Sequence, residues 1–420
     1  MLAEHAAATH ERRGAHLVTS TARLDLLSAA SFANGQPHDE YRWLRDHAPV
    51  YHHAEPDGPG FWAITRYADV KAIGRDSETF SSEPTVMITD ETAIEIGDHK
   101  MMLMADPPYH TRLRRVINSE FTPKSAEGWR PRIESLCGKI VDEVVERGEC
   151  DFMADIAGEI PSYVIAELMG IPLEDGRRLY SLTETIHAAP ESLPPGAGLG
   201  AVVEMFNYAH EVAEEKRRHP SNDLASKIVQ AEVDGRRLDD IDFNLFFLLL
   251  VDAGGDTTRN LLGGGLLALF DHADQRVRLQ EDLDGCLAGA VDEMLRWVSP
   301  VIYMRRRATR SVTLHDVDIR EGDKVVMYYG AANRDERAFT DPDRFDIGRR
   351  PNEHVAFGGG GPHFCLGAHI ARIEIAAMLR EVLTRLPDIE PAGPVEWLPS
   401  NFISGPKHLP VRFTERPRGA

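Results

Sequence analysis

The chain has 420 residues, and its 47 lysine and arginine residues against 67 aspartate and glutamate residues give a formal net charge of −20. An acidic balance of this size repels phosphate backbones and anionic lipid, which disfavours nucleic acid and membrane surfaces as partners. The longest apolar run, Phe243 to Val251, is far shorter than the ~20 residues that a membrane helix needs, and Met1 to Leu17 contains no signal-peptide pattern. We therefore expect a cytoplasmic protein that is not inserted in a membrane.

Residues 1–37 predict a flexible, loosely held N-terminal tail, and residues 38–420 predict a single domain because no repeat or low-complexity linker divides them. Alternating residues predict two short strands around a turn within residues 50–65, and another pair within residues 312–329 around Arg320, Glu321 and Gly322. Three- and four-residue spacing of apolar residues predicts helices over residues 128–148, 159–170, 201–218, 240–272, 279–297 and 366–386. The expected fold class is mainly α with small β-sheets.

The helix predicted over residues 240–272 is unusual. At ~1.5 Å per residue it is roughly 45–50 Å long, and it is apolar nearly all round, which is typical of a helix inside a protein. Its middle nevertheless reads Ala253-Gly254-Gly255-Asp256-Thr257-Thr258. Broken local rules of this kind mark functional sites. The structural alternative is a kink or a close helix crossing at the two glycines, with Thr257 bonded back to a carbonyl.

Four cysteines are scattered along the chain without a CxxC pair, which argues against a structural zinc site or a disulfide framework. The last of them, Cys365, lies in the loop FGGGGPHFCLG at residues 357–367, directly before the last predicted helix. The N-terminus of a helix favours a thiolate over a thiol. We therefore expect Cys365 to be chemically active.

A thiolate at this position is either a nucleophile or a metal ligand. A nucleophile needs a base, and His363 is the candidate, as in a cysteine hydrolase without a metal. A single soft ligand without a surrounding set of Cys and His residues is better suited to an iron whose other ligands come from a porphyrin. A buried structural cysteine is the remaining alternative.

On these segments the chain resembles the cytochrome P-450 family of heme-thiolate monooxygenases, and the resemblance covers nearly everything from about Tyr41 onward. The soluble bacterial branch is the most similar. Four motifs occur in the order of the family: AGGDTT at 253–258, ExxR at 293–296, DPDRF at 341–345 and the cysteine loop. Phe357 and Cys365 are eight positions apart, one more than in the commonest form of the loop. That longer form resembles actinobacterial enzymes that oxidise sterol side chains and methyl-branched lipids, and some terpene hydroxylases.

The resemblance implies the cytochrome P-450 fold, with the long central helix over a buried heme b. It implies that Cys365 is the proximal iron ligand, with Phe357 at the start of its loop. It also implies a buried ion network beside the heme, formed by Glu293, Arg296 and Arg344. Because Glu293 and Arg296 are three positions apart, they share one helix face. The alternative for this pair is an ordinary surface ion pair.

Heme carries two propionates, which require cations in so acidic a chain. The family pattern implies His110 and Arg114, which share a helix face at i, i+4, together with His363. The spacing from Pro300 selects Arg306, with Arg305 as the alternative if the strand is shifted. For each of these residues the alternative is a solvated basic side chain.

On the other side of the heme, the resemblance places the middle of the central helix. Gly254 and Gly255 are expected to leave room for dioxygen, Thr257 to hold a hydrogen bond and Asp256 to relay protons. The Asp–Thr pair favours electrons from a separate ferredoxin and reductase over peroxide. A basic patch of Arg112, Arg115, His369 and Arg372 would dock an acidic ferredoxin; plain surface charge is the equal alternative.

Apolar residues in the segments that form pockets in the family are expected to line a substrate pocket: Val86, Met87, Leu249, Leu250, Ala253, Val301, Ile302, Phe402 and Ile403. We expect a monooxygenase that inserts one oxygen atom of O2 into a C–H bond of a hydrophobic molecule of the terpenoid, steroid or branched fatty-acid class. The alternatives are a biosynthetic tailoring enzyme of the same fold that couples or rearranges its substrate, a non-catalytic heme-binding sensor, and the cysteine hydrolase.

Overall fold

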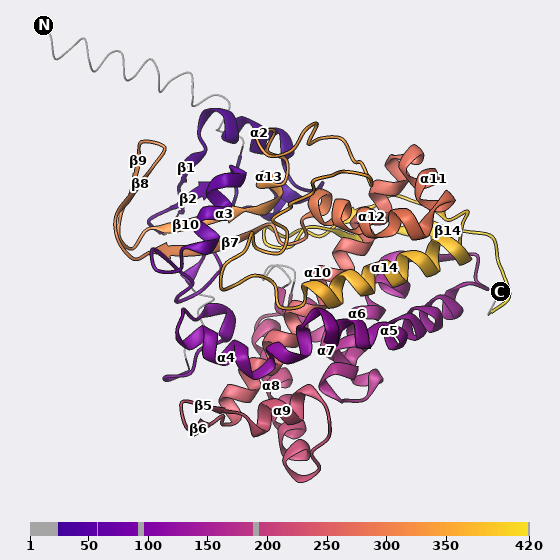
Figure 1. The fold of residues 1–420 in the computed structure, drawn as a ribbon, viewed down its shortest axis with the longest axis horizontal. Coiled ribbons are helices and arrows are strands. Elements are labelled where there is room, and N and C mark those ends of the chain that lie inside the picture. Colours follow the sequence, from indigo (N-terminus) through magenta and orange to yellow (C-terminus); the bar gives the residue numbers. More distant parts are fainter. Residues whose placement is uncertain (1–23, 57, 91–95, 188–192, 419–420) are drawn as a thin grey trace, which may run out of the picture.

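The computed structural model describes residues 24–56, 58–90, 96–187 and 193–418. Helices make up most of the described chain, and Figure 1 shows the larger sheet at the left with α5, α6, α12 and α14 gathered at the right. The α-helices are α2 (His38–His47), α3 (Tyr67–Arg75), α4 (Tyr109–Ile117), α5 (Pro123–Val144), α6 (Glu159–Met169), α7 (Leu173–His187), α8 (Ala197–Arg218), α9 (Leu224–Gln230), α10 (Asp240–Asp271), α11 (Ala273–Glu281), α12 (Leu283–Val298), α13 (Tyr329–Ala332) and α14 (Ala368–Arg385). Shorter helical turns are η1 (Ala29–Phe32), η3 (Met102–Met104), η4 (Asn118–Phe121) and η5 (Met153–Ala157).

The largest sheet has the strand order β1-β2-β10-β7-β3. Strand β10 runs parallel to β2 and antiparallel to β7, so it joins the N-terminal hairpin to the C-terminal half of the chain. The strands are β1 (Val50–His53), β2 (Phe61–Ile64), β3 (Phe80–Ser81), β4 (Glu149–Asp151), β5 (Glu232–Val233), β6 (Arg236–Arg237), β7 (Tyr303–Ala308), β8 (Val312–Leu314), β9 (Val317–Ile319), β10 (Lys324–Tyr328), β11 (Glu390–Pro391), β12 (Glu396–Trp397), β13 (Pro406–His408) and β14 (Pro410–Arg412).

Helix α10 is the centre of the helical core, as predicted. It runs unbroken for 32 residues and packs against α6, α7, α8, α12 and α14. Its start is fixed by a capping box, in which the Asp239 side chain accepts from the backbone of Asp242 while the Asp242 side chain accepts from the backbone of Asp239. The predicted bounds of 240–272 are therefore correct to one residue.

The other predicted helices are present with shifted ends. Helix α5 begins at Pro123 rather than at 128, because the Thr122 side chain caps its first turn. The helix predicted over 279–297 is wrong at its start. Helix α11 ends at Glu281, and the Asp282 side chain accepts from Gly285 N (2.9 Å) to begin α12. The apolar spacing continues across Asp282, so it predicts one helix where the cap separates two.

The predicted hairpin over 50–65 is confirmed, since β1 and β2 pair antiparallel with Val50 opposite Ile64. The pairing predicted within 312–329 is wrong. Strand β8 pairs with β9 around His315 and Asp316, which both have positive φ, whereas β10 pairs with β2 and β7. The alternation identified strands, but it carries no information about their partners.

The expected N-terminal tail is only partly described, because residues 1–23 lie outside the described residues. Residues 24–37 are not a loose tail. Leu26 and Phe32 are 0% and 2% exposed and belong to the core that contains Tyr41 and Tyr328. Burial of these apolar side chains anchors the segment. That the remainder is a single domain stays a prediction.

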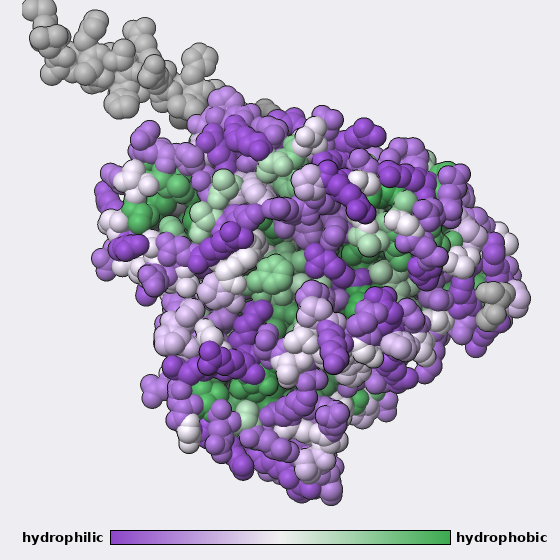
Figure 2. All heavy atoms as spheres, in the orientation of Figure 1, coloured by the Kyte–Doolittle hydropathy of each residue, from purple (hydrophilic) through white to green (hydrophobic). Residues whose placement is uncertain are grey.

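Hydrophilic residues cover most of the face shown in Figure 2, and hydrophobic ones lie mainly in its hollows. Among the described residues, no helix on its own has the length and apolarity to cross a membrane. One pair, Met153–Met169 with Leu173–Ile186, meets the length and composition requirement together, but it is bent by 117°.

Candidate functional site

Cys365 ends a loop whose shape requires glycine. Gly358 to Gly361 all have positive φ, between 70° and 105°, a region that residues with a Cβ rarely adopt. A Cβ at Gly361 would lie 2.3 Å from the carbonyl oxygen of Gly74 in α3. The loop closes where Cys365 N donates to the carbonyl of Phe357 (3.0 Å). The additional glycine therefore belongs to a run of four residues that all adopt positive φ before Cys365.

Several groups around the thiol of Cys365 favour its ionised form. Their combined effect is nevertheless too small to make it a thiolate. Burial raises the pKa of this thiol above its usual value, while a hydrogen bond from Gly367 N and the nearby Arg114 and Arg372 lower it by less. The helix N-terminus therefore does not suffice to produce the thiolate that the sequence led us to expect. Coordination to a metal ion deprotonates a thiol outright, and that would supply the missing stabilisation.

Arg372 is fixed beside the cysteine loop. Its guanidinium lies 4.6 Å from the ring centroid of Phe357, and its Nε donates to Asp292 (2.9 Å). His354 Nε2 lies 3.5 Å from the same carboxylate. Of the other residues in the expected basic patch, Arg112 pairs with Asp234 (2.8 Å), whereas Arg115 and His369 are exposed. The docking role of this patch stays a prediction.

Four basic groups from three segments gather near Cys365: His110 and Arg114 of α4, Arg306 of β7 and His363 of the cysteine loop. The rings of His110 and His363 have centroids 4.1 Å apart, and Arg114 Nη1 donates to the carbonyl of Pro362 (3.1 Å). We call these four residues the cation cluster.

In the cation cluster, the positive charge near neutral pH is that of Arg114 and Arg306, and it disfavours a proton on either histidine. Burial, Arg306, His110 and Arg114 lower the pKa of His363 to about 2. Burial and Arg114 lower the pKa of His110 to about 4, against a smaller opposing effect of Asp106. The buried Nδ1 of His110 has no hydrogen-bond partner among the described residues. An anionic group is therefore the ligand that this cluster fits.

The position of Arg305 settles which of the two neighbouring arginines faces the cluster. Arg305 Nη1 donates to the carbonyls of Met87 (3.2 Å) and Ile88 (3.1 Å) and to Asp90 Oδ1 (2.6 Å). Successive side chains of a strand point to opposite faces. Arg306 therefore lies with His110 and His363, whose pKa values it lowers.

The middle of α10 is partly accessible, between Asp252 and Thr257. Ala253 is exposed and Asp252, Gly254 and Thr257 are partly exposed within a mostly buried helix, and no atom of another described segment lies within 4 Å of where a Cβ of Gly254 would be. Thr257 Oγ1 donates to the carbonyl of Ala253 (3.0 Å), as in the structural alternative. Gly255 does not leave room: its Cβ would lie 3.1 Å from Cδ2 of Tyr180 in α7. The two glycines thus have different roles.

The residues expected to line a pocket divide into two groups. Met87, Ala253, Val301 and Phe402 retain some exposure, and Leu249, Leu250 and Ile403 are 6%, 9% and 7% exposed. Val86 and Ile302 are 1% and 0% exposed and are packed within the protein, so their prediction is wrong. Val301 bridges to Ile403, and the alternation of the strand then turns Ile302 into the core with Tyr328.

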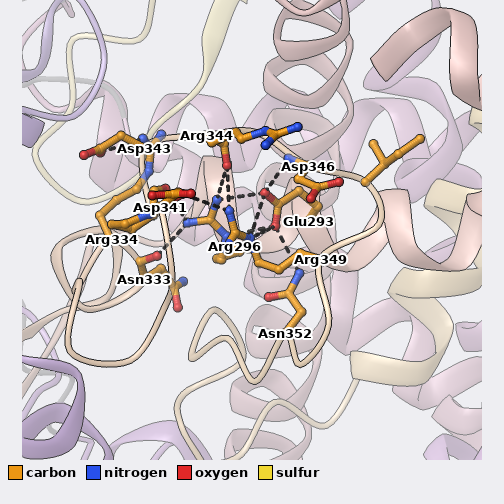
Figure 3. A network of polar contacts seen from close by, with 12 residues as sticks. Glu293, Arg296, Asn333, Arg334, Asp341, Asp343, Arg344, Asp346, Arg349 and Asn352 are labelled. Carbon is orange, nitrogen blue, oxygen red and sulfur yellow. Dashed lines mark hydrogen bonds and ion pairs between the residues drawn. The ribbon is translucent and has the colours of Figure 1, made fainter. Parts of the chain in front are cut away.

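A buried ion network holds the chain that leads to the cysteine loop (Figure 3). Glu293 and Arg296 are 0% exposed and form two hydrogen bonds of 2.8 Å, so the predicted pairing is confirmed. Arg349, rather than Arg344, is the second arginine: its Nε lies 3.2 and 3.1 Å from the two oxygens of Glu293. Asn352 Nδ2 and Asp346 N donate to the same carboxylate.

Arg344 contributes its backbone and not its side chain. Its carbonyl accepts from Arg296 Nη2 (3.2 Å) and from Arg349 Nη2 (2.7 Å), and the residue is exposed. Nothing in the sequence distinguishes Arg349 from its neighbour Arg350, because the choice depends on how residues 341–352 fold around Glu293. The prediction of an Arg344 side chain in this network is therefore wrong.

One buried acid was missed by the sequence analysis. Glu374 of α14 is 5% exposed, and burial raises the pKa of its carboxyl to about 7 against a hydrogen bond from Thr258 of α10. Its spacing from Ile370 and Met378 places it on the apolar face of the helix, which was the available signal. This hydrogen bond links α14 to Thr258 of α10, the neighbour of Thr257.

Comparisons with known proteins agree on one family. A family model described as Cytochrome P-450 matches residues 199–387. A methyl-branched lipid omega-hydroxylase of Mycobacterium tuberculosis is 38% identical over 390 residues, covering 88% of this chain and 90% of the relative. A steroid C26-monooxygenase of Mycolicibacterium smegmatis is 37% identical over 397 residues, covering 93% and 96%. A solved cytochrome P-450 of Mycobacterium marinum in complex with pseudoionone has a TM-score of 0.86 and 37% identity, covering 93% of this chain and 98% of that one.

Because Arg349 and Arg344 contribute differently to the ion network, replacing them should change the free energy of unfolding by different amounts. Replacing Arg349 with Met removes its bonds to Glu293 and to three carbonyls, and it should lower the free energy of unfolding by about 2–4 kcal/mol. Replacing the exposed Arg344 with Met keeps its carbonyl and should change it by less than about 0.5 kcal/mol. Urea unfolding of both variants checks this, and equal losses would contradict the assignment.

Glu374 predicts a pH dependence of stability. The unfolded chain loses this proton near the ordinary pKa of 4.5 and the folded chain near 7, so its stabilising effect is complete below 4.5 and is lost as pH rises to about 7. At about 1.4 kcal/mol per unit, Glu374→Gln should gain about 3 kcal/mol relative to the native chain between these limits. Unfolding at pH 5 and pH 8 measures the gain, and a pH-independent difference would show that the carboxyl is already ionised.

Proposed function

This chain belongs to the cytochrome P-450 family, and on that basis we propose that it is a heme-thiolate monooxygenase that inserts one oxygen atom of O2 into a C–H bond of a hydrophobic small molecule. The observation that carries the proposal is the cation cluster beside a half-buried thiol. Arg114 acts electrostatically on both Cys365 and His363, so the thiol and the uncompensated charge belong to one site. Membership in this family decides against the cysteine hydrolase.

The residues of this site fit heme b. Cys365 would bind the iron, and Arg114, Arg306, His110 and His363 would bind the propionates, which supply the anionic charge that the cluster lacks. The Glu293–Arg296–Arg349 network would hold the residues before the cysteine loop. When bound, the heme supplies the iron at which O2 is activated.

The chain's own residues supply space, hydrogen bonds and protons on the opposite side. Ala253 and Gly254 would leave space for dioxygen at the middle of α10. Thr257 is partly exposed there and offers a hydroxyl whose oxygen accepts a hydrogen bond while its proton is held by the Ala253 carbonyl. Asp256, 7% exposed on the adjacent side of the helix, would pass protons towards Thr257.

The substrate proposal rests on the accessible apolar residues and on the relatives. Met87, Val301 and Phe402 offer apolar surface, and methionine adapts to irregular shapes. The relatives are named for oxidation of methyl-branched lipids and of steroids, and one solved neighbour binds pseudoionone. We propose a molecule with a branched aliphatic chain or a steroid skeleton. A cytoplasmic location and a ferredoxin that docks near Arg115 and His369 complete the proposal.

Labelled dioxygen tests the proposed function. The purified protein, a ferredoxin and its reductase are incubated with 18O2 and with a methyl-branched fatty acid, a steroid or an acyclic terpenoid, each first screened for a shift in the spin state of the heme. One labelled oxygen atom in a hydroxylated product is the expected result. A rearranged product without labelled oxygen would favour the biosynthetic tailoring enzyme. Reduction of the heme iron without any consumption of oxygen would favour the non-catalytic sensor.

Thr257 should control how electrons are used. Thr257→Ala leaves every proposed heme-binding residue in place, so heme content should stay unchanged while hydrogen peroxide rises several-fold per electron consumed, because the hydroxyl that organises proton transfer is missing. Thr257→Ser keeps the hydroxyl and is the matched control. Unchanged coupling in the alanine variant would contradict the role of Thr257.

A further inference from the structure

Tyr180 of α7 lies between two carboxylates above the middle of α10. Its hydroxyl donates to Glu184 Oε1 at 3.3 Å, its ring lies against Gly255, the residue before Asp256, and burial together with the Asp256 carboxylate raises its pKa. The Asp256 residue is 7% exposed, whereas the Glu184 side chain is 46% exposed. A single phenol therefore connects an acid inside the protein with an acid at its surface.

The phenol in the middle of this connection is held in place by packing. The Tyr180 ring rests against Gly255, where a Cβ would lie only 3.1 Å from its Cδ2. Tyr180 and Glu184 are four positions apart on α7, so they share a helix face. The phenol is thus fixed over the segment of α10 that carries Asp256 and Thr257.

Arg259 balances the charge of the two acids. Its guanidinium lies 5.7 Å from the Tyr180 ring centroid, and its Nη1 lies 3.4 Å from Glu184 Oε1. Carbonyls of Met153 (3.4 Å) and Lys407 (3.2 Å) accept its other donors. Because Arg259 is buried and held at several atoms, two carboxylates can share one phenol without mutual repulsion separating them.

The Tyr180 phenol stays protonated, and its single O–H can donate to only one of the two carboxylates at a time. Burial and the neighbouring Asp256 raise the pKa of Tyr180 well above its usual value. When Glu184 takes up a proton from solvent, its O–H can donate to the phenol oxygen while the phenol O–H donates to Asp256. If both protons shift together, the Glu184 O–H and phenol O–H bonds break, a new phenol O–H and an Asp256 O–H form, and Tyr180 remains neutral.

We propose that Glu184 and Tyr180 form the route by which protons from solvent reach Asp256. This inference rests on the proposed function, since it supplies the protons that reduction of dioxygen consumes. It makes Tyr180 a positioning and relay residue. The competing interpretation is a structural hydrogen bond that only fastens α7 to α10.

The test compares conservative variants in the complete heme-loaded protein with its ferredoxin and reductase. Tyr180→Phe keeps the ring against Gly255 and removes the hydroxyl; Glu184→Gln removes the surface acid. Both should lower the rate of oxygen consumption by about tenfold or more and change its solvent deuterium isotope effect. Heme content should be unchanged. Oxygen consumption is measured because it requires protons whether or not a substrate is hydroxylated.

Tyr208→Phe is the matched control. Tyr208 also donates to a carboxylate, Asp175 (2.7 Å), and also has a guanidinium over its ring, that of Arg178 at 5.9 Å, but it is not connected to Asp256. This variant should keep the native rate and isotope effect. If Tyr180→Phe behaves like Tyr208→Phe, the relay is overturned.

A second readout does not depend on turnover. In urea unfolding, Tyr180→Phe and Asp256→Asn should shift the midpoint by less together than the sum of their separate shifts, because they remove the same hydrogen bond. If the two midpoint shifts are additive, Tyr180 and Asp256 are not in contact and the relay is overturned. If the shifts are coupled but Tyr180→Phe keeps the native rate of oxygen consumption and the native isotope effect, the hydrogen bond is structural only and the relay is likewise overturned. A native chain that consumes oxygen without hydroxylating any substrate, while Tyr180→Phe still changes the isotope effect, would refute the proposed function and support the relay.

Discussion

Buried positive charge without a matching acid is the constraint on which the rest of this structure depends. His110, Arg114, Arg306 and His363 come from a helix, a strand and the cysteine loop, and burial together with the two arginines lowers the pKa of both histidines. Asp106, an acid that acts electrostatically on His110 and Arg306, is already engaged by Ser81 and by the backbone of Ser82. Burying charge without a partner is costly, so the folded chain is organised to receive an anion beside the Cys365 thiol. A heme whose propionates meet the cation cluster satisfies both requirements.

Helix α10 explains why that site is also a reactive one. Its accessible side, at Ala253, Gly254 and Thr257, offers space and one hydroxyl, while its opposite side at Gly255 is closed by Tyr180. Asp256 lies at the boundary between the two. The two glycines thus lie in different surroundings: a Cβ at Gly254 would meet no other segment within 4 Å, whereas a Cβ at Gly255 would press against the Tyr180 ring.

The sequence predicted features that depend on local spacing and failed on those that depend on distant partners. The extent of α10, the glycine-rich shape of the cysteine loop and the Glu293–Arg296 pair all follow from residues close together in the chain. The choice of Arg349 over Arg344, the burial of Ile302 and the pairing of β10 with β2 and β7 depend on segments far apart in sequence. The contact between Tyr180 and Asp256 is of the same kind, since no periodicity on α7 indicates which part of α10 it will cover.

The most direct test of the central claim is the absorbance difference spectrum of the reduced, heme-loaded protein with and without carbon monoxide, which reports which protein side chain binds the iron. Thiolate ligation by Cys365 predicts the long-wavelength Soret band that gives the family its name, and Cys365→His predicts its loss with heme still bound. A short-wavelength band in the native protein, or an unchanged spectrum in the variant, would show that Cys365 is not the iron ligand and would contradict the account.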